Sequence, residues 1–444
     1  MRLFIDAKWL SSIHETPEVR EAGAKLSIVL GDEVLTRNID EWSKTVSDDV
    51  RLSAYPLALW FAANWWRLRW EPLPSQGTPS TSWRMSHELA AAGYGFVWPQ
   101  VAIASDGEGI QMWSVQTPES VSAPVKYLTS AYGVVPADEF ESALDQFFDD
   151  VIARLNALQV SDSPLHSLLA ELAEERSDGE LNAYRRLEAM AGYDPGEGPS
   201  DLLAQLEALI PEGGLNAAQE IATLTSVPFK NALSDALSMA SSQGIKAAPA
   251  VFEHDVVSFA SNRLAPAWVR GRELADRIRR KLGIYGEPIR DSRLYEIMGI
   301  SAGAVAEAPR HVGASLGLAV RKGRGQFELH LRKRAPTSIR FELARLLCDQ
   351  LLTDPADKWL PSTDAKTSRQ KVQRAFAAEF LCPIDSLTSH LKGDFSDDAL
   401  DDAAHHFQVS PYAVQSQLTN HDIIPRGLPF DFQGETAFPY RIGH

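Results

Sequence analysis

The chain has 444 residues, of which 44% are hydrophobic and 23% are charged, a composition typical of a folded protein with two or three domains. A net charge of −16 argues against a protein that coats nucleic acid or an anionic membrane with its whole surface. The two cysteines are too few for a disulfide framework, and neither a secretory leader nor a bilayer-spanning apolar stretch is apparent. We therefore expect a cytoplasmic protein without a membrane partner.

Residues 1–130 combine strand and helix patterns, which predicts an N-terminal α+β domain. KLSIVLGDEVLTRNI is typical of a hairpin that turns at Gly31-Asp32, and VAIASDGEGIQMWSV of one that turns at Asp106-Gly107. Between them, LALWFAANWWRLRWEP predicts a helix that ends near Pro72. Nine of the 11 tryptophans lie in the first 113 residues. They could form a recognition surface, but a tryptophan-rich core is the favoured interpretation because such rings are usually buried.

Residues 137–260 are expected to be helical. Apolar residues recur at helical spacing in four segments that Gly- and Pro-rich breaks separate. These segments are FESALDQFFDDVIARLNAL, SLLAELAEER, AYRRLEAMAGY and LLAQLEALI. The next stretch, NAAQEIATLTSVPFKNALSDAL, could be a helix-turn-helix, but one lysine and two acidic residues favour a plain helical hairpin.

Residues 265–444 are expected to form a third domain of helices around a hairpin. The helices WVRGRELADRIRRKLGI and EPIRDSRLYEIMGI come first, followed by a hairpin that turns between Gly323 and Gly325. Three further helical stretches then follow in order along the chain. They are RFELARLLCDQLL, QKVQRAFAAEFLCP and DDAAHHFQVSPYAVQSQLTN.

Over residues 265–425 this order of elements resembles the ImmA/IrrE family of bacterial metallopeptidases. The matching positions are Arg340-Phe341, Leu343-Ala344, the segment FAAEFLCP from Phe376 to Pro383, and in the tail Phe407, Val409, Ser410, Ala413 and Leu418. The resemblance implies an α+β multidomain protein whose C-terminal domain is zincin-like and ends in a helix-turn-helix-like tail.

The zinc motif of that family is degenerate in this chain. A zincin needs two histidines one helical turn apart, a general-base glutamate and a third ligand. On the alignment these positions hold Arg345, Leu346, Asp349 and Val372. An arginine cannot ligate a metal and a leucine cannot activate water, so we expect no catalytic residue, no metal and no cofactor. A replacement site from Cys348, Asp349 and Glu379 with His390, His405 or His406 is the less favoured alternative.

The metal-binding face of the aligned helix is expected to carry charges instead. Glu342, Arg345 and Asp349 share one stripe of the helix, where charge pairs could close the old site, although an ordinary solvated face is the simpler alternative. Ile339, Leu343, Leu346, Leu347 and Leu351 form the apolar stripe.

A basic stretch is the best candidate for a binding surface. Between Leu264 and Arg345 there are 17 lysines and arginines against 8 acidic residues, so this stretch is positive by 9. The residues are Arg270, Arg272, Arg277, Arg279, Arg280, Lys281, Arg321, Lys322, Arg324, Arg332, Lys333 and Arg334. Docking onto acidic parts of the chain or of a partner is favoured over binding to phosphates.

These patterns favour a catalytically inactive ImmA/IrrE-like pseudo-metallopeptidase that binds another protein as a regulator or scaffold. Active members, as the resemblance implies, cut a transcriptional repressor in bacterial stress responses or mobile-element control, and a role in phage defence fits the same habit. One alternative is an active metal-dependent hydrolase with atypical ligands. Another is a nucleic-acid-binding regulator that uses the basic 270–334 surface.

Overall fold

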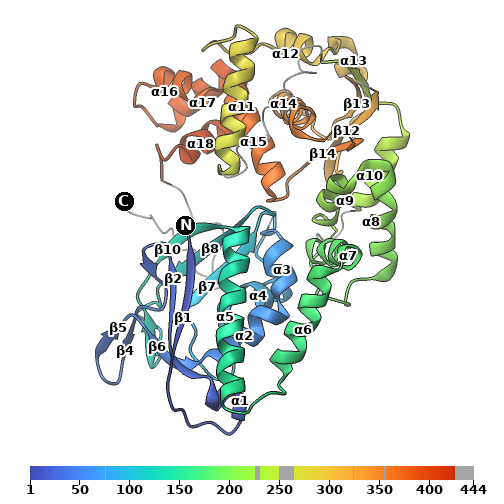
Figure 1. Cartoon of the computed structure of the whole chain (residues 1–444). Helices are drawn as coiled ribbons and strands as arrows, with labels where there is room; N and C mark the ends of the chain where they lie inside the picture. Colours follow the sequence, from blue (N-terminus) through green and yellow to red (C-terminus); the bar gives the residue numbers. More distant parts are fainter. Residues whose placement is uncertain (76, 226–230, 250–264, 324, 355, 426–444) are drawn as a thin grey trace. The chain divides into compact units, whose positions relative to one another are not determined.

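The computed structural model describes residues 1–75, 77–225, 231–249, 265–323, 325–354 and 356–425, and the fold is mixed α+β with several small antiparallel sheets (Figure 1). The chain forms two compact units. Unit 1 contains Met1–Leu203, and unit 2 begins at Ala204 and is described to residue 425. Helix α8, Ser200–Gly213, crosses this division. The division falls inside the expected helical stretch 137–260, whose first helices therefore belong to unit 1.

Unit 1 is built on three antiparallel sheets. In the first sheet, β2 pairs with β1, β3 and β6; the second has the order β10-β8-β7 and the third β5-β4-β9. The strands are β1 (Leu3–Trp9), β2 (Gly23–Leu30), β3 (Glu33–Val34), β4 (Asn38–Asp40), β5 (Thr45–Ser47), β6 (Val50–Ser53), β7 (Gln100–Ser105), β8 (Gly109–Val115), β9 (Val125–Tyr127) and β10 (Ala131–Pro136). The expected hairpins are β2–β3 and β7–β8, and Gly31 (φ +61°) and Gly107 (φ +97°) supply the left-handed backbone of their turns.

The helices of unit 1 cover these sheets, and α5 packs against β1, β8 and β10. They are α1 (Pro17–Glu21), α2 (Ala54–Ala63), α3 (Trp65–Trp70), α4 (Thr81–His87), η1 (Leu89–Ala92), α5 (Ala137–Ala157), α6 (Pro164–Ser177) and α7 (Gly179–Met190). The helix expected before Pro72 is in fact α2 and α3, separated at Asn64, whose side chain donates to the Trp60 carbonyl at 2.8 Å. An asparagine that hydrogen-bonds its own preceding turn ends a helix in this way.

The tryptophans of unit 1 mostly fill its core. Trp60, Trp65, Trp66, Trp83, Trp98 and Trp113 are buried. Trp9 and Trp70 are half-buried, whereas Trp42 is 96% exposed. The core interpretation therefore holds for these buried rings, and Trp42, in the turn between β4 and β5, is the exception.

Unit 2 contains a four-stranded antiparallel sheet of order β11-β13-β12-β14. Its strands are β11 (Ile245–Ala247), β12 (Leu316–Gly323), β13 (Gln326–His330) and β14 (Trp359–Thr363). The hairpin expected around Gly323–Gly325 is β12–β13, and β11 is a strand inside the stretch expected to be helical.

The helices of unit 2 pack around α14 and α15. They are α9 (Leu215–Ala222), α10 (Ala232–Ser241), α11 (Ala267–Lys281), α12 (Asp291–Met298), α13 (Ala302–Glu307), α14 (Pro336–Leu352), α15 (Ser368–Leu381), α16 (Ile384–Leu391), α17 (Asp397–Phe407) and α18 (Pro411–Asn420). Helix α14 contacts α15, β12 and β14, and α11 lies along α15 (Figure 1). Gly271 permits this close approach, since an added Cβ would lie 2.6 Å from the Val372 carbonyl oxygen.

The tail has the two helices that the sequence predicts. Gln408, at φ +56°, turns the chain between α17 and α18, and Ser410 accepts a hydrogen bond from the Ala413 N–H at the start of α18. The sequence pattern did not indicate α16. The connection between α9 and α10 contains residues 226–230, so the turn of the helical hairpin expected there lies outside the described residues. No helix in the described part of the chain combines the length and apolarity needed to cross a bilayer.

The two kinds of tryptophan in unit 1 should respond differently to truncation. Trp66→Ala is expected to lower the free energy of unfolding by about 3–5 kcal/mol, because the buried indole also donates to Glu175 at 2.7 Å. Trp42→Ala should change it by less than about 0.5 kcal/mol. Urea denaturation followed by circular dichroism measures both changes. A large loss of stability in the Trp42 variant would contradict the placement of Trp42 outside the core.

Candidate functional site

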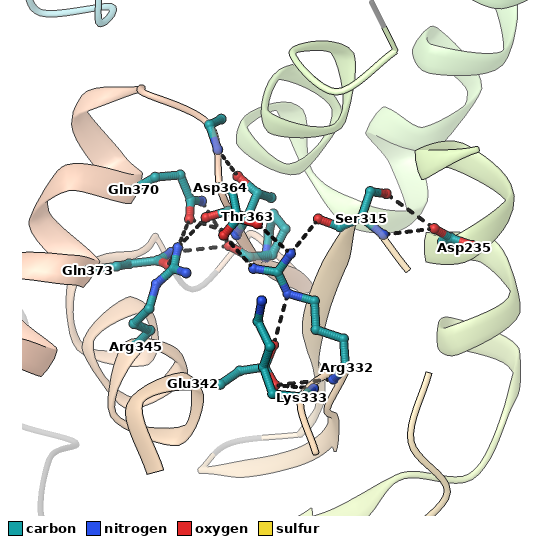
Figure 2. Close-up of polar contacts among 12 residues, drawn as sticks. Asp235, Ser315, Arg332, Lys333, Glu342, Arg345, Thr363, Asp364, Gln370 and Gln373 are labelled. Carbon is teal, nitrogen blue, oxygen red and sulfur yellow. Dashed lines mark hydrogen bonds and ion pairs between the residues drawn. The ribbon is translucent and has the colours of Figure 1, made fainter. Parts of the chain in front are cut away.

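The charged face of α14 is buried rather than solvated. Glu342, Arg345 and Asp349 are 3%, 4% and 2% exposed. Each side chain binds a residue from another segment of unit 2. Figure 2 shows the contacts of Glu342 and Arg345. The opposite stripe is apolar as expected, with Leu343, Leu346, Leu347 and Leu351 in the core. Helix α14 is therefore enclosed on both faces, and the simple alternative of a solvated polar face is wrong.

Arg345 joins α14 to the end of β14 and to the first turns of α15. Its Nη2 donates to the Thr363 carbonyl at 2.5 Å, to Gln370 Oε1 at 2.5 Å and to Gln373 Oε1 at 3.3 Å (Figure 2). All three acceptors are neutral. Burial, together with the nearby Arg374 and Arg332, lowers the pKa of Arg345 to about 9.

Asp349 forms a buried ion pair with Arg369 of α15. Two parallel bonds, Nε to Oδ1 at 2.8 Å and Nη2 to Oδ2 at 2.6 Å, make the pair bidentate. The Thr353 hydroxyl donates to the same carboxylate at 3.1 Å. Although burial opposes it, the Asp349 carboxylate raises the pKa of Arg369 above its ordinary value. This pair holds α15 against α14 beside the Arg345 contacts.

Glu342 is bound to the segment that follows β13. Its carboxylate accepts from Arg332 Nε at 3.2 Å and from the backbone N–H groups of Arg332 and Lys333 at 3.1 and 3.3 Å. The same guanidinium binds both oxygens of Asp364, at 3.0 and 2.8 Å (Figure 2). Burial alone would raise the pKa of Asp364, but the bonds from Arg332 lower it to about 2. One arginine thus neutralises carboxylates from two segments.

The residues at the degenerate positions do not fit a zinc ion. Arg345 supplies a fixed cation, while Leu346 and Val372 lie in the hydrophobic core. Asp349 is the one possible donor of the four, and both its oxygens face Arg369. A guanidinium beside the site repels a dication, so this donor set does not suit a metal.

The alternative metal ligands are not brought together. Glu379 Oε1 accepts from the Ile384 N–H at 3.2 Å and Oε2 from the Gln417 amide, while His390 bonds Asp402 at 2.9 Å and stacks on His406. Cys348 is buried, and burial raises the pKa of its thiol. Within the described ranges, no three His, Cys, Asp or Glu side chains are grouped to hold a metal ion.

The basic residues on α11 are divided between interior and surface. Arg279 is 2% exposed and donates to the carbonyls of Phe380 and Glu287 at 2.6 and 2.7 Å. Arg270 donates to Ser368 at 2.7 Å, and Arg272 lies 3.9 Å from Asp276. Arg277, Arg280 and Lys281 are exposed. Arg279 therefore belongs to the framework between α11 and α15 and not to a binding surface.

The basic residues on and after the hairpin are divided in the same way. Arg332 is buried, Arg321 donates to the Asp357 carbonyl at 3.2 Å, and Lys322 lies 3.0 Å from Glu328. Lys333 is half-buried and Arg334 is exposed, whereas Arg324 lies outside the described residues. The eleven of these residues that the structure describes do not all lie on the surface, and several bind acceptors within unit 2.

Four polar residues at the start of α15 were missed in the sequence. Arg369, Gln370, Gln373 and Arg374 all bind groups on α14, β14 or the loop between β14 and α15. Their i, i+1, i+4 and i+5 spacing puts them on one side of the helix. This polar run, just before the FAAEFLCP segment, was the available signal.

The buried ion pair on α14 yields a prediction for stability. Arg369→Met should lower the free energy of unfolding by about 3–5 kcal/mol, because it leaves the Asp349 charge buried and uncompensated. The double variant Asp349→Leu/Arg369→Met should recover most of this loss. The exposed pair Arg293–Glu296 is the matched control, and its equivalent double variant should change stability by under about 0.5 kcal/mol. Chemical denaturation of the unmodified protein, the single variants Asp349→Leu and Arg369→Met, and the two double variants measures these changes. Additive losses in the Asp349–Arg369 cycle would contradict the coupling.

Glu379 yields a prediction for pH dependence. Burial, helped by the Asp276 carboxylate, raises the pKa of Glu379 from 4.5 to about 7. Between these values the folded state binds more protons than the unfolded state, so the unfolding free energy falls as pH rises. Relative to Glu379→Gln, the unmodified protein should lose up to about 3 kcal/mol from pH 4.5 to above pH 7. Denaturation curves across this range test it; a constant difference between the two proteins would refute the shift.

Comparison of the chain with known proteins found no matching protein-family model, no matching curated protein and no matching solved structure.

Proposed function

We propose that unit 2 contains an inactive ImmA/IrrE-like metallopeptidase domain, and that the protein acts by binding another protein as a regulator or scaffold. One observation carries this proposal. The guanidinium of Arg345, at the position of the first zinc ligand in the resemblance, is buried and bonded to three neutral oxygens. A cation built into the framework takes the place where that family would hold its metal.

The order of elements supports the relationship. A lead-in helix α11, the hairpin β12–β13, the helices α14 and α15, and the two-helix tail follow one another within one compact unit. Arg340, one of the matching positions, lies on α14 and donates to the Gln408 carbonyl in the turn of the tail at 3.0 Å. It also binds Asp291 at the start of α12. This matching residue therefore lies where α14 meets the tail and the start of α12.

The chemistry of the same positions supports the loss of activity. Leu346, in place of the general base, is fully buried among apolar side chains and has no group that could take a proton from water. Asp349 is engaged by Arg369 on both oxygens, so it is not free to act as a base or a ligand.

A protein partner is supported by exposed aromatic side chains on unit 2. Tyr285 and Tyr412 are 75% and 77% exposed, and tyrosine is among the residues that contribute most to binding at protein interfaces. The control of a mobile element or a role in phage defence is an extension from the resemblance. In that setting the partner would be a regulator encoded nearby.

The metal content of the purified protein tests the inactive reading. Well below one Zn, Mn or Fe ion per chain is expected by mass spectrometry, together with no peptide hydrolysis, because the donor set repels a dication. Near-stoichiometric metal that the isosteric variant Asp349→Asn removes would contradict the proposal and favour an active hydrolase with atypical ligands.

The proposed binding of a partner protein is tested with the same purified protein. The product of the adjacent gene, co-expressed with the chain, should co-purify with it intact, and Tyr412→Ala should weaken this association about tenfold or more. Cleavage of that product, or an association that neither Tyr412→Ala nor Tyr285→Ala weakens, would count against a scaffold that binds through these tyrosines.

A further inference from the structure

The loop between β14 and α15 is held by three arginines from three different segments. Arg345 of α14 donates to the Thr363 carbonyl at 2.5 Å, and Arg332 binds Asp364 in bidentate fashion (Figure 2). Arg374 of α15 donates to the Ala365 carbonyl at 3.0 Å. The loop thus gathers guanidinium groups that are remote in the sequence.

Positive charge exceeds negative charge around this loop. Three carboxylates contact this segment. Glu342 and Asp364 both bind Arg332, and Glu220 accepts a hydrogen bond from the Thr367 hydroxyl at 2.8 Å. Burial raises the pKa of Glu220, which favours its uncharged form, so Arg332, Arg345, Lys366 and Arg374 outnumber the charged carboxylates. Within the part of the chain that the structure describes, Arg345 and Arg374 bond neutral oxygens, and Lys366 has no carboxylate within hydrogen-bond distance. Burial lowers the pKa of all three cations. Cations held in low dielectric without counter-charge are costly, so an anion supplied from outside would stabilise this loop.

The loop also retains a donor and a route to solvent. Arg345 Nε is buried and has no hydrogen-bond partner in the described residues. Lys366 and Arg374 are half-buried, and the Asp364 side chain is 37% exposed. The cluster therefore extends from a fully buried guanidinium to side chains that solvent reaches. A small ligand could meet Lys366 and Arg374 first without opening the core.

We propose that Arg345, Arg374 and Lys366 form a binding site for a phosphoryl group at the β14–α15 loop. A phosphoryl dianion has enough charge and oxygen atoms to face three separate cations, whereas a single carboxylate carries one charge and two oxygens. The Asp364 carboxylate opposes an anion, but its bidentate pair with Arg332 neutralises it. The site does not depend on the loss of peptidase activity.

The source of the phosphoryl group is either inorganic phosphate or a small phosphorylated metabolite. Both present the same terminal oxygens to the cations, so the charge arrangement alone accommodates either. Occupation would tie α14, the loop and α15 together and raise the thermal stability of unit 2 by mass action.

Calorimetric titration of the full chain with inorganic phosphate and with AMP, at constant ionic strength, tests the site. One saturable site per chain is expected, and Lys366→Gln should weaken it about tenfold or more because a charge-assisted bond is lost. Lys246→Gln is the matched control, since Lys246 is an exposed lysine of β11 in the same unit, and it should leave the affinity within about twofold. Lys366→Arg should retain binding.

Titration with phosphate and with AMP distinguishes inorganic phosphate from a phosphorylated metabolite as the bound ligand. Saturable binding of phosphate and AMP supports a general phosphoryl site, and binding of AMP alone supports a phosphorylated metabolite. No saturable binding of either up to about 10 mM overturns the proposal. Equal weakening by Lys366→Gln and Lys246→Gln overturns it as well, because the effect would then reflect net charge. Citrate, titrated under the same conditions, is the comparison anion. Tighter binding of citrate than of phosphate and AMP would overturn the assignment of a phosphoryl ligand. Circular dichroism of each variant confirms that the fold is retained.

Discussion

The centre of unit 2 depends on the hydrogen bonds that the buried guanidinium of Arg345 donates. This guanidinium bonds the last residue of β14 and two glutamines of α15, so one side chain connects the central helix to the sheet and to its neighbouring helix. A metal ion in a zincin connects its helices by the same principle, through several ligands that converge on one cation. Here the cation is covalently part of α14, and its acceptors are neutral oxygens.

This arrangement requires the other charges of α14 to be satisfied across elements. Buried charges are tolerated only when they are paired and hydrogen-bonded, and Asp349 and Glu342 meet this condition through Arg369 and Arg332. The partners come from α15 and from the segment after β13. The polar interior therefore specifies how these segments dock, because a shift of one of them would leave a charge without its partner. The surplus of cations at the β14–α15 loop is the part of this network that its own carboxylates do not balance.

Several helices and hairpins of this fold could be predicted from local sequence patterns. The hairpins at Gly31 and Gly107, the position of α14 and the two-helix tail follow from short-range signals, namely glycines in turns and apolar spacing along helices. The break at Asn64, the strand β11 and the helix α16 were not predicted. A three-residue strand such as β11 has too few residues for a periodic pattern, and it forms because β13 pairs with it.

The charged side chains of α14 show most clearly what the sequence determines and what the tertiary structure adds. The sequence by itself determined that Glu342, Arg345 and Asp349 share one stripe of α14, because residue type and helical spacing are local properties. Only the tertiary structure decided that these side chains are buried, that their partners lie outside α14, and that Arg279 and Arg332 are internal supports and not surface residues. The reason is physical: burial and ion pairing depend on which segments pack together, and the partners Arg369, Asp364 and Gln370 lie 20 to 32 residues from the groups they bind.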